Sequence, residues 1–358
     1  MSLDNVFMGK RVVQQIYLKN ALIYQSKGWE TLPSAPQVEW TKNFGTVSTF
    51  SGDCAVDQDN NICIATFNYI YKISSEGDLI WKKLNANSIG MKMCIDHDNN
   101  IYIATPDNPA KLQKLDKNGN VLATGATSNP IDTFSGFIVD NNNLYLAGQK
   151  DNHQYDHFYV LDKSLNLVQS EDVHADALVT SDNSPYIYFG KGSFLYRIEK
   201  NNFRGILNSN LPVINEKPPY DTIYVGANII KLAMDDMGNI YYITNSYGIY
   251  KCNINTKNIT KLVDGTYAMG GLCIDYQKNI YCLKYSISGA SPYPANLVKT
   301  SSDGTLIYDT PIVKNDSEAG LRQGAVIADN NGNIYFIYQN YSGELLITKI
   351  INLVKKGN

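Results

Sequence analysis

Acidic turns supply the first residues in this sequence whose type and spacing could do chemistry. The turns DQDNN, DHDNN and DNNN start at Asp57, Asp96 and Asp140, and their side-chain oxygens are of the kind that binds calcium. A calcium loop needs six or more oxygen ligands and is normally closed by a bidentate Glu, which does not follow these turns at a suitable spacing. Asp and Asn also bond their own backbone in tight turns. We therefore interpret these segments as hairpin turns and predict no metal ion and no cofactor.

Histidine and cysteine could provide a transition-metal site. His153 and His157 lie four residues apart beside Asp151 and Asp156, but that spacing places two side chains on one face only in a helix. We expect this segment to be an exposed loop between two strands. The cysteines include no CxxC pair and no disulfide-like framework, so we interpret them as small buried hydrophobic residues with free thiols. They are Cys54, Cys63, Cys94, Cys252, Cys273 and Cys282.

The common catalytic patterns do not occur in the sequence. It has no GxSxG elbow, no paired Cys and His, and no HExxH. Carboxylates from separate repeats could still meet as they do in glycoside hydrolases, and His174 or Glu318 could act as the base of a lyase. The other loop carboxylates are Glu171, Glu216 and Glu344. We predict no catalytic residues and no enzyme activity; a perturbed acid–base cluster near the centre of the fold would favour the enzyme alternative.

Composition and charge exclude several classes of protein. The 358 residues are 44% hydrophobic, which supports a folded core rather than a disordered chain. Lys and Arg number 31 against 34 Asp and Glu, a net charge of −3 without a basic stripe, so nucleic acid is not an expected partner. No apolar run reaches the ~18 residues of a membrane span, and the MSLDNVFMGK start does not resemble a signal peptide. We expect neither membrane insertion nor export through a leader.

An internal repeat predicts the fold. Segments such as MCIDHDNNIYIAT (93–105) and VIADNNGNIYFIY (326–338) share an apolar run, an Asp, a turn and a second apolar run. Each is followed by a third strand and by a fourth such as Leu79–Leu84. Seven copies about 45 residues apart, each with four antiparallel strands, predict an all-β, seven-bladed β-propeller. The Asp residues that anchor the copies are Asp57, Asp96, Asp140, Asp182, Asp235, Asp275 and Asp329.

The two ends of the repeat region predict how the ring closes. The last copy leaves little room for a fourth strand before the chain ends. Val38–Phe44, however, precedes the first copy and resembles Leu79–Leu84, with Trp40 in the place of Trp81. We therefore expect this N-terminal stretch to form the outer strand of the seventh blade, where it protects a sheet edge.

Binding residues are expected on one face of the propeller. There the loops between second and third strands lie beside the connections between blades, and these segments are long and uneven. They are 44–53, 125–136, 149–157, 208–228, 285–296 and 311–323. Irregular loops on a rigid scaffold commonly form binding sites, and Tyr offers an apolar ring with a polar tip that suits sugars or a protein surface. The candidate ligand-binding residues are Tyr155, Tyr247, Tyr285, Tyr293, Tyr341 and Arg322.

The first 37 residues do not match the repeat. Arg11–Leu18 and Ala21–Gln25 are expected to form two short strands around the turn Lys19-Asn20. A stretch that contains proline leads from them to the repeats and should be extended. We therefore divide the chain into a short N-terminal β module with its linker (1–37) and the propeller (38–358).

Two resemblances suggest a biological setting. Val6-Phe7-Met8-Gly9, Ile16-Tyr17-Leu18 and Leu22-Ile23-Tyr24-Gln25 resemble a short module at the start of structural proteins of phages and prophages of Gram-positive bacteria, including tail-tip and adsorption components. The DxxGNIYxA type of repeat resembles NHL-like propellers. The first resemblance implies that the module attaches the chain to other virion proteins. The implied attachment residues are Phe7, Met8, Ile16, Tyr17, Leu22, Tyr24 and Trp29.

These observations favour a non-enzymatic phage virion component of the tail, baseplate or fibre, whose propeller binds a host-surface glycan or protein. Such a protein would be made in the host cytoplasm and located in the virion. Two alternatives stay open. One is a purely architectural virion protein, and the other is a cytoplasmic propeller that acts as an interaction scaffold or as a lyase-like enzyme.

Overall fold

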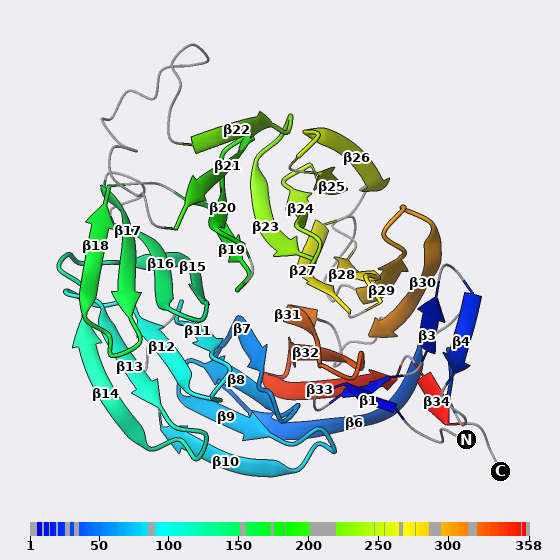
Figure 1. Cartoon of the computed structure of the whole chain (residues 1–358). Coiled ribbons are helices and arrows are strands. Elements are labelled where there is room, and N and C mark those ends of the chain that lie inside the picture. The colour runs from blue at the N-terminus through cyan, green and yellow to red at the C-terminus, as the bar shows by residue number, and fades with distance from the viewer. Residues whose placement is uncertain are drawn as a thin grey trace.

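Antiparallel strands and their connections make up the computed structural model of the chain (Figure 1). It describes residues 6–8, 11–13, 15–18, 21–25, 29–31, 36–84, 90–150, 155–172, 175–182, 184–200, 220–246, 248–253, 255–264, 268–275, 277–285, 295–313, 321–351 and 353–355. Within these ranges there is no helix with the length and apolar character needed to span a membrane.

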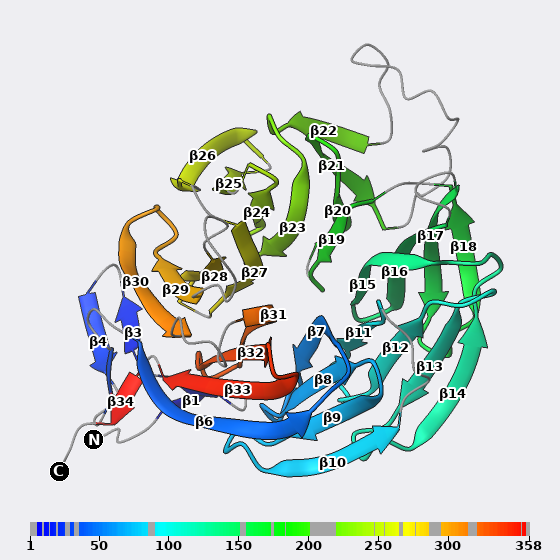
Figure 2. The same ribbon diagram turned by 180° about the vertical axis from the view of Figure 1, so that it is seen from behind.

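Seven four-stranded sheets stand around a central axis as the blades of a ring (Figures 1 and 2), and in blades 1 to 6 four consecutive strands run from the axis outward. Blade 1 contains β7 (Phe50–Val56), β8 (Ile62–Thr66), β9 (Tyr69–Ile73) and β10 (Leu79–Leu84). Blade 2 contains β11 (Lys92–Ile95), β12 (Ile101–Thr105), β13 (Lys111–Leu115) and β14 (Val121–Ala126). Blade 3 contains β15 (Thr133–Val139), β16 (Asn143–Lys150), β17 (Tyr155–Asp162) and β18 (Leu167–Glu171).

The next three blades repeat this order. Blade 4 contains β19 (Ala177–Thr180), β20 (Tyr186–Lys191), β21 (Phe194–Glu199) and β22 (Tyr220–Tyr224). Blade 5 contains β23 (Ile229–Met234), β24 (Asn239–Thr244), β25 (Ile249–Asn253) and β26 (Asn258–Val263). Blade 6 contains β27 (Ala268–Ile274), β28 (Ile280–Tyr285), β29 (Ala295–Thr300) and β30 (Leu306–Val313). The predicted all-β, seven-bladed architecture is confirmed.

Blade 7 joins the two ends of the ring. Its inner strands β31 (Leu321–Ala328), β32 (Ile334–Asn340) and β33 (Glu344–Ile351) come from the end of the chain, and its outer strand is β6 (Gln37–Thr46). Figure 2 shows the blue β6 along the red β33. The predicted N-terminal closing strand is confirmed and extends slightly beyond 38–44.

Short strands outside the blades involve both ends of the chain. β1 (Val6–Met8) pairs with β2 (Arg11–Val13), β3 (Gln15–Leu18) with β4 (Ala21–Gln25), and β5 (Trp29–Thr31) with β34 (Leu353–Lys355). The strand predicted over 11–18 is therefore two strands with different partners, because its halves join different hairpins. The division at residue 37 stays a prediction. The attachment residues that the phage resemblance implies, Phe7, Met8, Ile16, Tyr17, Leu22, Tyr24 and Trp29, lie on β1, β3, β4 and β5.

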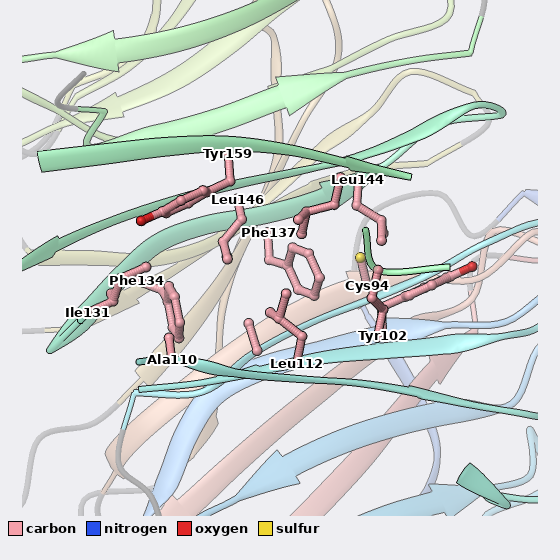
Figure 3. Packing of buried hydrophobic residues seen from close by; sticks show 13 residues of the cluster. Cys94, Tyr102, Ala110, Leu112, Ile131, Phe134, Phe137, Leu144, Leu146 and Tyr159 are labelled. Atoms are coloured by element: carbon pink, nitrogen blue, oxygen red, sulfur yellow. The ribbon is translucent and has the colours of Figure 1, made fainter. Parts of the chain in front are cut away.

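Buried side chains fill the space between neighbouring blades. Tyr102 and Leu112 of blade 2, for example, pack with Phe137, Leu146 and Tyr159 of blade 3 (Figure 3). Burying a side chain of this size contributes ~1.5–3 kcal/mol. Because each blade buries its faces against its neighbours, closure of the ring is a condition for the core.

A buried aspartate anchors the turn between the first and second strands of most blades. In blade 2 the Asp96 carboxylate accepts backbone N–H bonds from Asp98 (3.0 Å) and Asn100 (2.9 Å) and a bond from the Tyr102 hydroxyl (2.9 Å). Burial alone would raise the pKa of Asp96, but these bonds and the Asn100 side chain outweigh it and lower the pKa. The bond from Tyr to Asp recurs at Asp140, Asp235, Asp275 and Asp329.

Lysine completes this network in blade 1 and links the blade to its neighbour. Cys63 stands where other blades have the tyrosine, and Lys72 on the adjacent β9 pairs with Asp57 at 2.7 Å, both side chains being buried. The same Nζ donates to the carbonyl of Lys117 in the outer turn of blade 2 (3.0 Å). A buried ion pair thus fastens blade 1 to blade 2.

Blade 4 differs from the prediction that Asp182 anchors its turn. One additional residue lengthens this turn, as the strand register shows, and Ser181 takes the anchoring place. Asp182 instead contacts His97 of blade 2. Lys200 donates to the Ser181 carbonyl (2.8 Å) and pairs with Asp140 of blade 3 at 2.7 Å. The prediction for Asp182 is therefore wrong, because the turn was taken to have the same length in every blade.

Candidate binding site in the central channel

The first strands of the seven blades stand around the central axis of the ring (Figure 1). They line a cavity of about 210 Å³ in the central channel. These strands are β7, β11, β15, β19, β23, β27 and β31. One position of the repeat, four residues before the anchoring Asp or Ser, contributes a residue from every blade to the cavity wall. The seven residues, here called the channel layer, are Asp53, Lys92, Gly136, Ala177, Lys231, Gly271 and Ala325.

Four members of the channel layer are glycine or alanine, and two of them allow close packing of the inner strands. A Cβ on Gly136 would lie 2.9 Å from the Leu178 side chain. Gly271 has φ +65°, and a Cβ there would lie 2.9 Å from the Val326 backbone nitrogen. The small residues therefore leave the centre of the layer open for the three charged side chains.

The charged side chains come from blades 1, 2 and 5. Lys92 Nζ lies 3.6 Å from the Asp53 carboxylate, which also accepts the backbone N–H of Met93. The Lys231 amine makes no hydrogen bond or ion pair to another described residue. Its side chain is exposed to the water of the channel, with atoms of the surrounding strands close by. Partial desolvation by these strands lowers the pKa of Lys231, the charge of Lys92 lowers it further, and Asp53 opposes the shift.

A backbone irregularity adds a hydroxyl to the same cavity. The register of β15 and β16 shifts between Phe134 and Gly136, which leaves Ser135 as a bulged residue on the wall. Its Oγ is buried and has no hydrogen-bond partner within the described part of the chain. The cavity thus presents two ammonium groups and one carboxylate, while the hydroxyl of the lining residue Ser135 is buried.

The loop-face residues predicted from the sequence lie in three different blades. Tyr155 begins β17, Tyr285 ends β28, and Arg322 is the bulged residue near the start of β31. Tyr341 is in the turn between β32 and β33, with its side chain 41% exposed. These four residues belong to blades 3, 6 and 7, so they are not contributed by a single blade. The remaining two, Tyr247 and Tyr293, lie outside the described residues.

Part of one predicted loop-face segment is a strand. The segment 208–228 was expected to connect blades, but β22 (220–224) is the fourth strand of blade 4 and pairs with β21. Residues 208–219 lie outside the described residues. Only 225–228 connects two blades.

The histidines and cysteines that were considered for metal binding can now be placed in the fold. His157 lies on β17 rather than in a loop, and its Nδ1 is 3.0 Å from Asp172; His153 is outside the described residues. Among the residues that are described, no three His, Cys, Asp or Glu side chains form a group suited to a metal ion. All six cysteines are free, as predicted, and burial raises the pKa of the Cys63 thiol to about 12.

The outer rim exposes apolar side chains on three consecutive blades. On β10, β14 and β18 the first two residues are apolar and exposed, and Leu84 on β10 is exposed as well. Leu84 is 75% exposed, Val168 60% and Val121 56%. The remaining exposed residues of this apolar rim are Leu79, Ile80, Leu122 and Leu167.

Solved structures share this architecture, whereas no protein-family model and no curated protein matches the chain. The chain is similar over 88% of its length to the WD40 propeller domain of Doa1 (97% of that chain, 12% identity, TM-score 0.58). It is similar over 96% of its length to a chain of the Mitotic Checkpoint Complex (98% of that chain, 11% identity, TM-score 0.61). It is similar over 88% of its length to U3-55K (99% of that chain, 11% identity, TM-score 0.64). The fold is a WD40-like, seven-bladed β-propeller. At such low identity the similarity concerns the fold of this propeller alone, and the phage setting stays a prediction.

Reasoning from the sequence missed the channel layer of this propeller. Its charged members are far apart in the sequence and form no linear motif. The available signal was the repeat alignment, in which the position four residues before the anchor is either small or charged while the next three positions are mostly apolar.

The lowered pKa of Lys231 predicts a specific dependence of stability on pH. The groups that face its amine are Lys92, Asp53 and Cys54. Because the folded pKa lies below the unfolded value of ~10.4, the folded chain binds fewer protons between the two values, and stability rises with pH across this window. Lys231→Met removes this partly desolvated, unpaired charge, so we expect the variant to be more stable than the wild type at neutral pH.

Denaturant unfolding of both proteins from neutral to alkaline pH measures this effect. The stability difference should shrink as pH rises and Lys231 loses its proton. A difference that stays constant over the whole range would contradict a lowered pKa.

Proposed function

We propose that this chain is a non-enzymatic propeller that binds another protein through the apolar rim of blades 1 to 3. The exposure of leucine, isoleucine and valine on β10, β14 and β18 supports the proposal. Soluble proteins seldom leave grouped apolar side chains in water, and such groups mark interaction sites. A partner with an apolar ridge would cover them.

The structural comparisons agree with an interaction role. One similar chain was solved as part of the Mitotic Checkpoint Complex, an assembly of proteins. The rigid ring would serve in the same way here, since its blades hold the rim residues in fixed positions.

The charges in the channel are better suited to binding than to catalysis. A perturbed acid–base pair would favour an enzyme, and Lys231 is a perturbed base. Its potential acidic partner Asp53, however, is engaged by Lys92 and by the Met93 N–H. We therefore infer that the channel holds a molecule rather than converting one.

Substitution of the rim tests the proposal. The triple variant Leu84→Ser, Val121→Ser and Val168→Ser removes apolar area without touching the core, so the fold should be kept and a partner lost. The matched control Val38→Ser, Ile259→Ser and Leu306→Ser changes exposed residues of the outer strands of blades 7, 5 and 6.

Proteins that copurify with each tagged full-length chain from its own cells are quantified by mass spectrometry, and direct binding is then measured with the purified partner. We expect at least about tenfold less partner with the rim variant, a loss of ~1.4 kcal/mol, and an unchanged amount with the control. Equal recovery with all three proteins would contradict the proposal.

A virion component that adsorbs to a host surface is the second candidate. It is favoured by the hairpins β1–β2 and β3–β4, which pair with no blade strand in the described residues, and by the resemblance of the same segment to phage proteins. Full-length chain should then bind intact Gram-positive cells saturably, and Tyr341→Ala should weaken binding because this exposed ring lies on the loop face. Absence of saturable binding would contradict this candidate.

A further inference from the structure

We propose that the channel layer binds a small monocarboxylate, with the carboxylate beside the Lys231 amine and the aliphatic part against the apolar wall. This goes beyond the rim, which lies on the opposite edge of the blades from the channel. The site is assembled from β7, β11, β15 and β23, and it exists only when the ring is closed.

Charge accounts for the preference for a single negative charge. The layer contains two ammonium groups and one carboxylate, and Lys92 is already paired with Asp53 at 3.6 Å. The Lys231 amine is left without a hydrogen bond or ion pair to any described residue. A carboxylate beside it would supply the missing partner through a charge-assisted hydrogen bond.

The remaining wall explains why the ligand should have a small apolar body. Leu178, Leu232, Leu272 and Val326 also line the cavity. A volume of about 210 Å³ is below the ~300 Å³ at which pockets for drug-sized ligands begin. A short aliphatic carboxylate satisfies both conditions, whereas inorganic phosphate would leave the apolar side uncovered.

Calorimetric titration of the full-length protein with sodium butyrate tests the site. Butyramide, which has the same shape without the charge, and sodium phosphate are titrated in parallel. We expect butyrate to bind to one site, with weaker binding at higher salt, and both other compounds to bind at least about tenfold more weakly, since one charge-assisted hydrogen bond is lost or the apolar wall is left open.

Two variants separate this site from non-specific binding. Lys231→Met should weaken butyrate binding at least about tenfold, and its thermal unfolding verifies that it is folded. Lys278→Met is the matched control. Lys278 is not part of the channel layer, and its Nζ pairs with the Asp236 carboxylate at 2.7 Å. No butyrate binding, equal binding by wild type and Lys231→Met, equal binding of butyramide, or a preference for phosphate would each overturn the proposal.

Discussion

A carboxylate buried in the first turn of a blade is the constraint on which the other features depend. Asp57 and Asp96 are almost completely inaccessible to water, and a buried charge is costly unless donors or a cation surround it. The turn supplies backbone N–H groups. A further donor is a tyrosine hydroxyl of the second strand in blade 2 and a lysine of the third strand in blade 1. The aspartate therefore links the strands of its blade, and in blade 1 Lys72 also binds the Lys117 carbonyl of the next blade.

Closure of the ring brings residues of different blades together in one cavity. The residue four positions before each anchoring Asp or Ser lines the same cavity in the channel. The charges of Asp53 and Lys92 then act on the pKa of Lys231, although the three residues belong to blades 1, 2 and 5. The chemistry of the channel is thus a product of the ring geometry, with no counterpart in any single repeat.

The repeat was sufficient to predict the blades from the sequence, and the likeness of 38–44 to Leu79–Leu84 was sufficient to predict the closing strand. The prediction failed where a turn or a connection of one blade differs in length from those of the other blades. An additional residue displaced Asp182 from the anchoring place, and the fourth strand of blade 4, Tyr220–Tyr224, was unrecognised because a long segment separates it from β21. Lys231 could not be assigned to a site from one blade alone, since its neighbours in space come from other parts of the ring.

A double-mutant cycle on Asp57 and Lys72 tests the buried carboxylate most directly. Lys72→Met should lower the free energy of unfolding by ~3 kcal/mol, because it leaves Asp57 buried without its cation. In the Asp57→Asn background the same substitution should cost less than ~1 kcal/mol, and Lys117→Met, which keeps the carbonyl that Lys72 binds, should leave stability unchanged. An equal cost of Lys72→Met in both backgrounds would contradict the role assigned to the carboxylate.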